Sequence, residues 1–227
     1  QEMKFDIILS GADYHHTETL LDEKYRQYSE TYWDKKVFAP SSLLFYVGFS
    51  KKLENVAHHT LFFDVPFDIH AQAIYDNPQW PEDPLFYASF PSKTDANAAP
   101  DGQEAGIFLI PLAPGLDDIE EVREEYFEKI MGRFEHITNQ EVKKYVIFKK
   151  SFCIKDFIED YNSYKGNAYG LANTLLQTAF LRPSLKSKKV KGLYFTGQLT
   201  VPGPGVPPSL ISGKIVSSLI KKENANL

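Results

Sequence analysis

The residues best suited to chemistry form one short segment, residues 192–214, near the C-terminal end of the chain. It reads GLYFTGQLTVPGPGVPPSLISGK: an apolar run at 193–196, a loop of glycine and proline at 197–205, and a helical pattern that continues to about residue 222. Pro207 and Pro208 suit the first turn of that helix. Because glycines leave the backbone accessible and a helix start carries free N–H groups and a positive dipole end, the segment predicts a binding site for an anionic or electron-rich ring edge.

This segment resembles the C-terminal signature of the carotenoid (phytoene) desaturases, FAD enzymes of the amine-oxidase-like flavoprotein superfamily. In that signature a pattern LY..G..T.PG.G.P....SG follows the last strand. Further blocks lie in the order that the resemblance implies: SGADYHHT at 10–17, SSLLFYVGF at 41–49, HHTLFF at 58–63, and GNAYGLANT at 166–174 followed by Arg182 and Pro183. The resemblance therefore extends over most of the chain.

The resemblance implies an α+β fold with two kinds of segment. Residues 13–190 would form a substrate-binding domain, a mixed, largely antiparallel sheet with helices packed on it. Residues 1–12 would be the returning strand of a Rossmann-like FAD domain, and residues 191–227 its C-terminal strand, flavin loop and helix.

A phosphate-binding turn of the G-x-G-x-x-G type is missing from the sequence. The run GPGVPP at 203–208 ends in proline and lies outside any βαβ unit, so it does not qualify. We therefore expect the N-terminal dinucleotide-binding segment to be absent and the chain to be the C-terminal part of a longer protein. Alone, it should be inactive and should retain no flavin through purification.

The resemblance also implies roles for particular residues. FAD, the expected cofactor of the parent protein, would contact the loop and helix start, with Gly197, Gln198, Pro202, Gly203, Gly205, Val206 and Pro207 as the binding residues. An apolar polyene, phytoene or a related carotenoid, would pass along the backbone of Gly166, Tyr169 and Gly170. The implied reaction is desaturation, in which hydrogens leave a carbon–carbon pair for the flavin; no catalytic side chain is predicted, since the cofactor carries the difficult step.

Other functions remain open at this point. The same fold serves a flavin-dependent carotenoid isomerase, a hydroxycarotenoid dehydrogenase or an amine oxidase. The sequence blocks outside the C-terminal segment favour a desaturase over an amine oxidase. A non-enzymatic apolar-ligand-binding module is the alternative outside enzymology. An upstream strand followed by G-x-G-x-x-G would separate that module from the enzymes.

Composition narrows the classes of partner. The formal net charge is -5 with dispersed lysine and arginine, which disfavours nucleic acid. Cys153 is the single cysteine, which excludes an internal disulfide, and we expect it to be a thiol in the core. The sequence has no 18-residue apolar stretch, so no membrane-spanning helix is expected. The carotenoid substrate that the resemblance implies dissolves in lipid, so we expect a cytoplasmic protein that attaches peripherally to a lipid membrane surface. The aromatic run at 77–87 would be its anchor or, alternatively, a loop packed on its own domain.

The elements that must position these residues follow from periodicity. Strands are predicted at 5–10, 43–49, 61–63, 85–90, 107–111, 145–152 and 193–196, with 85–90 and 107–111 as antiparallel neighbours. Helices are predicted at 13–21 with Asp13 as the cap, from 117 or 118 onward, and at 171–181 before Arg182 and Pro183.

Histidine pairs at 15–16 and 58–59 and the acidic run of the helix after 117 raise the question of a metal. Adjacent residues on a strand face opposite sides, so His58 and His59 should point apart and form backbone hydrogen bonds. Acids in a first helical turn complement the dipole. We therefore predict no metal site.

Overall fold

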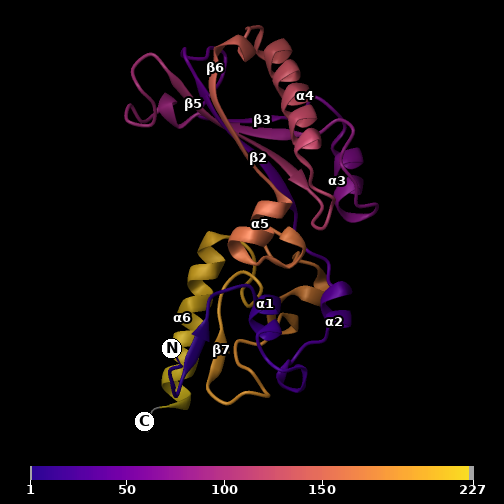
Figure 1. Ribbon diagram of the computed structural model, residues 1–227, viewed down its shortest axis with the longest axis vertical. Helices are drawn as coiled ribbons and strands as arrows, with labels where there is room; N and C mark the ends of the chain where they lie inside the picture. Colours follow the sequence, from indigo (N-terminus) through magenta and orange to yellow (C-terminus); the bar gives the residue numbers. More distant parts are fainter. Residues whose placement is uncertain (1, 225–227) are drawn as a thin grey trace. The chain divides into compact units, whose positions relative to one another are not determined.

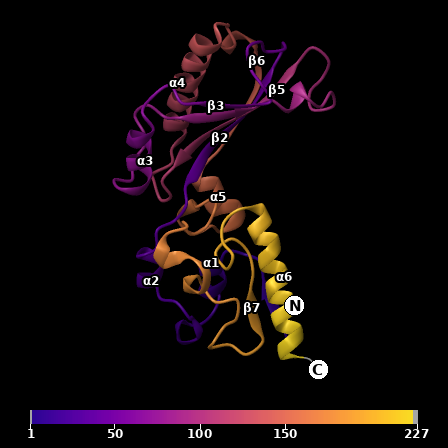
Figure 2. The same ribbon diagram turned by 180° about the vertical axis from the view of Figure 1, so that it is seen from behind.

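The computed structural model describes residues 2–224, which form two compact units. The terminal unit contains the residues up to Pro40 and those from Phe157 onward, and the inserted unit is continuous from Ser41 to Asp156. Figure 1 and Figure 2 show the elements of each from opposite sides. Residues 13–40 and 157–190, expected within the substrate domain, group here with the terminal segments.

The inserted unit is built on a five-stranded antiparallel sheet in the order β3–β4–β5–β2–β6. The expected α+β class with a largely antiparallel sheet is therefore confirmed. The pairing of Tyr87 with Leu109 confirms the predicted antiparallel neighbours. The strands are β2 (Ser41–Phe49), β3 (His59–Phe62), β4 (Phe86–Ser89), β5 (Glu104–Leu112) and β6 (Val146–Phe152).

One face of this sheet is covered by α4 (Glu120–Thr138), the long acidic helix that the periodicity predicts (Figure 1). Alternate residues of β2 and β5 point to that face and are buried, so the strands show the period of two expected of a half-covered sheet. Tyr126, Ile130 and Phe134 of α4 complete the core. A shorter helix, α3 (Phe67–Tyr75), follows β3 and was not predicted.

The other face of the sheet also carries a row of apolar side chains. The strand register places Leu61, Tyr87, Leu109 and Leu44 in one row across four strands, and all of them are partly or largely exposed. Tyr46 lies in the next row and is 39% exposed. An apolar face that is only partly buried is suited to an apolar ligand or partner.

The terminal unit contains a two-stranded parallel sheet of β1 (Ile8–Ser10) and β7 (Leu193–Phe195). Its helices are α1 (Tyr14–Thr19), α2 (Glu30–Asp34) and α6 (Val206–Glu223), and α5 (Ile154–Tyr161) crosses the boundary between the units. Its core contains Tyr14 and Phe195, whose stacked rings have centroids 3.8 Å apart. The predicted strands, the cap at Asp13 and the C-terminal helix are confirmed, with shorter strands at both ends.

The helix predicted at 171–181 is wrong. Leu171 instead forms a bridge with Phe38, and two 3-10 turns follow at Leu175–Gln177 and Ala179–Leu181. The reason lies in Gln177, whose buried side chain accepts from the N–H of Val37 at 2.9 Å and donates to the Val37 carbonyl at 2.7 Å. These bonds hold the segment in an irregular path that apolar periodicity alone does not reveal.

Of the two alternatives for residues 77–87, the structure favours the packed loop, because aromatic side chains of this segment contribute to the core. Phe86 is buried, and Trp80 packs against the core and donates from Nε1 to the carbonyl of Asp117 at 2.9 Å. The alternative, a loop packed on its own domain, describes the segment. No helix within residues 2–224 is long and apolar enough to cross a membrane.

The prediction that His58 and His59 point apart is wrong as well. Their rings stack with centroids 4.1 Å apart, and each Nδ1 bonds a side chain, Thr94 Oγ1 for His58 and Tyr87 Oη for His59. Among the described residues, no group of three or more His, Cys, Asp or Glu side chains is arranged to hold a metal ion.

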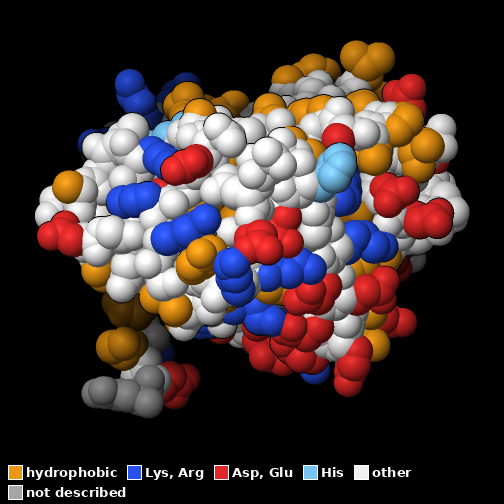
Figure 3. All heavy atoms as spheres, turned by 90° about the horizontal axis from the view of Figure 1, so that it is seen from above, with side chains coloured by type: hydrophobic (Ala, Val, Ile, Leu, Met, Phe, Trp, Pro, Cys, Tyr) orange, Lys and Arg blue, Asp and Glu red, His pale blue; other side chains and the backbone are white. Residues whose placement is uncertain are grey.

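Two further expectations concern the core and the surface. Cys153 is fully buried, as predicted, and burial raises the pKa of its thiol to about 12. On the face displayed in Figure 3, lysine and arginine side chains lie beside acidic ones instead of forming a separate basic area. Lys149 of β6, for example, forms an ion pair with Glu124 of α4.

Candidate functional site

The candidate site is the loop between β7 and α6, and buried hydroxyl groups hold its first half. Ser212 of α6 accepts a hydrogen bond from the N–H of Gly197 at 3.1 Å and bonds Thr200 Oγ1 at 2.7 Å. Both Ser212 and Thr200 are fully buried. The start of the loop is therefore tied to the helix that follows it.

Gly197 is the glycine whose missing side chain leaves open space. Its φ is +109°, and a β-carbon placed there would meet nothing within 4 Å. Only glycine adopts such a backbone without strain. A flat ligand group could approach the backbone closely at this position.

The other two predicted loop glycines serve the loop itself. A β-carbon on Gly203 (φ +135°) would lie 3.0 Å from Cζ of Arg182, so the guanidinium occupies the space of a side chain. Gly205 (φ +103°) precedes α6, and its carbonyl accepts from the N–H of Ser209 at 3.0 Å. The Val201–Pro202 peptide bond, which precedes Gly203, is cis.

The start of α6 offers fewer donors than an ordinary helix. Pro207 and Pro208 carry no N–H, and the N–H of Ser209 is used by Gly205. Among these first four residues of α6, Val206 therefore supplies the N–H group that a ligand could accept from. The positive end of the helix dipole remains, since it belongs to the whole helix.

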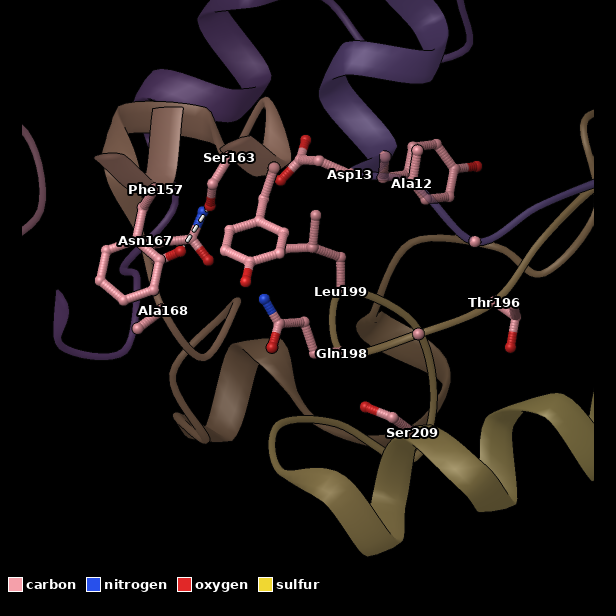
Figure 4. A pocket seen from close by; sticks show the side chains of 14 residues that line it. Ala12, Asp13, Phe157, Ser163, Asn167, Ala168, Thr196, Gln198, Leu199 and Ser209 are labelled. Carbon is pink, nitrogen blue, oxygen red and sulfur yellow. Dashed lines mark hydrogen bonds between the residues drawn. The ribbon is translucent and has the colours of Figure 1, made fainter. Parts of the chain in front are cut away.

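Two adjoining cavities open beside Gly197, with volumes of about 490 Å³ and about 420 Å³. Figure 4 shows the first, with Asp13 on one side and Gln198 and Ser209 on another. Both cavities lie within the terminal unit and share part of their lining, namely Ala168, Thr196, Gly197, Gln198 and Ser209.

The structure places the predicted residues in two groups. Gly197 and Gln198 line both cavities, and Tyr169, Gly205 and Val206 line the second. The lining does not include Pro202, Gly203, Pro207, Gly166 or Gly170. A β-carbon on Gly170 (φ +80°) would lie 2.9 Å from the Gln198 carbonyl oxygen, so packing against the loop accounts for this glycine.

Polar groups that we did not assign to the site lie in the first cavity. Asp13 caps α1 and also accepts from the N–H of Tyr164 at 3.3 Å, while Asn167 Oδ1 accepts from the N–H of Gly170 at 2.7 Å. Burial raises the pKa of Asp13 more than its backbone hydrogen bonds lower it. The sequence identified Asp13 as a cap, but nothing in its spacing linked it to residues some 150 positions away.

Comparisons with known proteins identify relatives of the chain. No known family profile matches the chain. It is 46% identical over 210 residues to the carotenoid 3,4-desaturase of Haloarcula japonica, covering 92% of this chain and 42% of that protein. It is 31% identical over 228 residues to the neurosporene-forming phytoene desaturase of Rhodobacter capsulatus, with coverages of 96% and 44%.

Solved structures show the same fold. An oxidoreductase from Methanosarcina mazei matches with a TM-score of 0.55 at 14% identity, covering 96% of this chain and 43% of that one. A putative protoporphyrinogen oxidase from Exiguobacterium matches with a TM-score of 0.51 at 12% identity, covering 94% and 41%. The chain thus spans about two fifths of the length of the curated relatives it matches.

Proposed function

We propose that this chain, which is homologous to the C-terminal part of the carotenoid desaturases, is the C-terminal part of a FAD-dependent enzyme that extends the conjugated double bonds of a carotenoid. The observation that carries the proposal is the match over 92% of the chain, which includes the loop with its open position at Gly197.

The residues at the loop fit FAD. Gly197 leaves space for a flat ring, Gln198 borders both cavities, and Gly205 and Val206 border the second. The dipole of α6 favours negative charge beside it. FAD, when bound, would supply the acceptor for the two hydrogens that leave adjacent carbons of the substrate. The chain's own part is to hold the ring at Gly197 and Val206, with Pro202, Gly203 and Pro207 shaping the loop.

An apolar polyene substrate suits the inserted unit, 41–156. The row of Leu61, Tyr87, Leu109 and Leu44 provides an apolar strip across four strands, and Tyr46 adds an aromatic ring beside it. We propose this unit as the main part of the substrate domain and the terminal unit as part of the FAD domain. Tyr169, which lines the second cavity, would contact the substrate near the flavin, with Gly166 and Gly170 shaping the adjacent backbone.

The parent enzyme would meet its substrate at a lipid membrane surface as a peripherally attached cytoplasmic protein. Carotenoids dissolve in lipid, which supports attachment. Exposed apolar side chains also occur in the terminal unit, where Leu175 and Phe180 are 92% and 90% exposed. No feature of the described surface favours nucleic acid.

The test is to incubate the full-length protein with FAD and phytoene in liposomes and to follow visible polyene absorption. New bands that require oxidised flavin are expected, and their position reports how many double bonds were added. Bound flavin without bands would move the substrate to a later carotenoid, or the activity to an isomerase or a hydroxycarotenoid dehydrogenase. A full-length protein that binds no FAD would refute the proposal.

A matched pair of variants connects the test to the loop. Gly197→Leu fills the open space beside the cavities and should abolish FAD binding. Gly102→Leu makes the same change at another positive φ, +76°, with nothing within 4 Å, in the hairpin loop of the inserted unit. FAD binding should survive this control, so equal loss in both variants would contradict the role of Gly197.

A further inference from the structure

Arg182 is a buried cation held by neutral groups. The residue is 4% exposed. Its Nη2 donates to the carbonyl of Leu171 at 3.0 Å and to Asn173 Oδ1 at 2.7 Å, and Nη1 makes a longer contact of 3.4 Å to the Gln198 carbonyl. Its Nε has no hydrogen-bond partner among the described residues.

None of the ion pairs found in residues 2–224 includes Arg182. Taking a guanidinium out of water costs several kcal/mol, and buried arginines are normally paired with a carboxylate. Arg123 shows the ordinary arrangement in this chain, with Asp118 at 2.6 Å and Asp156 at 2.8 Å. Burial also lowers the pKa of Arg182, yet arginine remains charged at neutral pH.

The charge of Arg182 is directed at the candidate site. Its guanidinium lies against Gly203, with Nη2 3.0 Å from the position of a β-carbon, and contacts the carbonyl of Gln198. It therefore touches the loop at two points between Gly197 and Gly205. The positive end of α6 begins at the end of the same loop. Two independent sources of positive potential thus act on the loop 197–205, and the described residues supply no carboxylate bound to Arg182.

We propose that Arg182 is a positioning residue that fixes the loop 197–205 and places an uncompensated positive charge behind it, to favour a ligand whose negative charge increases there. This inference rests on the proposed function, in which the ligand is FAD and the more negative form is reduced FAD. Arg182 acts through Gly203 and Gln198, since it does not itself line either cavity.

The experiment measures the midpoint potential of FAD bound to the full-length protein, because a structural role alone would not change it. Arg182→Gln removes the charge and should weaken the preference for reduced over oxidised FAD about tenfold, a shift of about 30 mV to more negative values. Arg182→Lys keeps the charge and should shift the potential by less than half as much, although it loses the planar contact with Gly203.

If Arg182→Gln does not fold, a second variant tests whether the charge of Arg182 affects the flavin potential. Asn173→Asp keeps the size of the side chain and places a carboxylate 2.7 Å from Nη2, which compensates the charge without removing the guanidinium. The potential should again become more negative, by a smaller amount because Asn173 is exposed. The control is Asn162→Asp, the same change at an exposed position, which should leave the potential unchanged.

The outcomes separate the two proposals. Flavin bound to the wild-type protein with an unchanged potential in Arg182→Gln, or in Asn173→Asp where the former does not fold, overturns the role of the charge and leaves the proposed function standing. A wild-type protein that binds no FAD overturns the proposed function and this inference with it.

Discussion

Replacing Gly203 by alanine would force a β-carbon to within 3.0–3.1 Å of the guanidinium atoms of Arg182. The side chain of Arg182 has little freedom to move, since Leu171 and Asn173 hold its Nη2 at 3.0 and 2.7 Å. Overpacking of this kind costs about 1–3 kcal/mol of the free energy of unfolding. The φ of +135° adds strain of about 1–3 kcal/mol for any residue other than glycine.

A double-mutant cycle separates these two costs. In the wild-type background Gly203→Ala should destabilise the terminal unit by their sum, about 2–6 kcal/mol. In the Arg182→Ala background the contact is gone and the strain remains, so the cost should fall to about 1–3 kcal/mol. The difference, a coupling energy of about 1–3 kcal/mol, measures the steric contact alone.

Urea unfolding monitored by tryptophan fluorescence measures the cycle. The chain has two tryptophans, Trp33 in the terminal unit and Trp80 in the inserted unit, so a Trp80→Phe background leaves Trp33 as the reporter of the unit that contains the loop. Trp33 is 1% exposed and should respond strongly to unfolding. A coupling energy below about 0.5 kcal/mol, the level at which separate sites simply add, would refute the steric explanation of Gly203.

Three further predictions concern buried polar and thiol groups. Ser212→Ala should cost about 1–3 kcal/mol in the same assay, because it leaves the N–H of Gly197 without its acceptor, while the Thr200 hydroxyl keeps its bond to the Gly197 carbonyl at 2.8 Å. The exposed Ser217→Ala should change the stability little. Burial alone would raise the pKa of Glu104, but hydrogen bonds from Ser92, Leu53 and Lys93 lower this pKa overall. The ionised Glu104 side chain therefore stabilises the fold above pH 4.5, and this stabilisation is lost as the pH falls through the lower native pKa. Thermal unfolding of the inserted unit, followed by Trp80 between pH 7 and about pH 3, should therefore depend less on pH in Glu104→Gln than in the wild-type chain, and equal slopes would contradict this. Cys153, buried with a pKa raised to about 12, should react with a thiol reagent at pH 8 only after urea is added, and rapid native labelling would contradict its place in the core.

The elements that carry the candidate loop could be predicted because their signals are local. An apolar run before the glycines predicts β7, and the prolines followed by an apolar helical pattern predict α6. The alternation of buried and more exposed residues in β2 and β5 is likewise a local pattern within each strand. The helix at 171–181 failed because the side chain of Gln177 bonds to Val37, which lies 140 residues earlier, and no local pattern records that contact.

The roles of the glycines could be predicted only in part. The sequence marks Gly197, Gly203 and Gly170 alike as places for close approach, but the structure gives each a different neighbour: open space for Gly197, Arg182 for Gly203 and the Gln198 carbonyl for Gly170. From the sequence, Arg182 is predicted only to follow the end of a helix. Its burial depends on the fold of the loop around it, and therefore on contacts between segments that are separate in the sequence.

The pairing of β2 with β6 also bears on how such proteins could be recombined. Residue 44 lies opposite residue 152, so the two points where the inserted unit joins the rest of the chain are close together, at the same end of the neighbouring strands β2 and β6. A module whose ends meet can be exchanged for a homologous one without stretching the host, because the host has only a short gap to close. Grafting the 41–156 segment of one relative into another would accordingly transfer the apolar row of its sheet and leave unchanged the residues of the terminal unit that line the cavities beside Gly197.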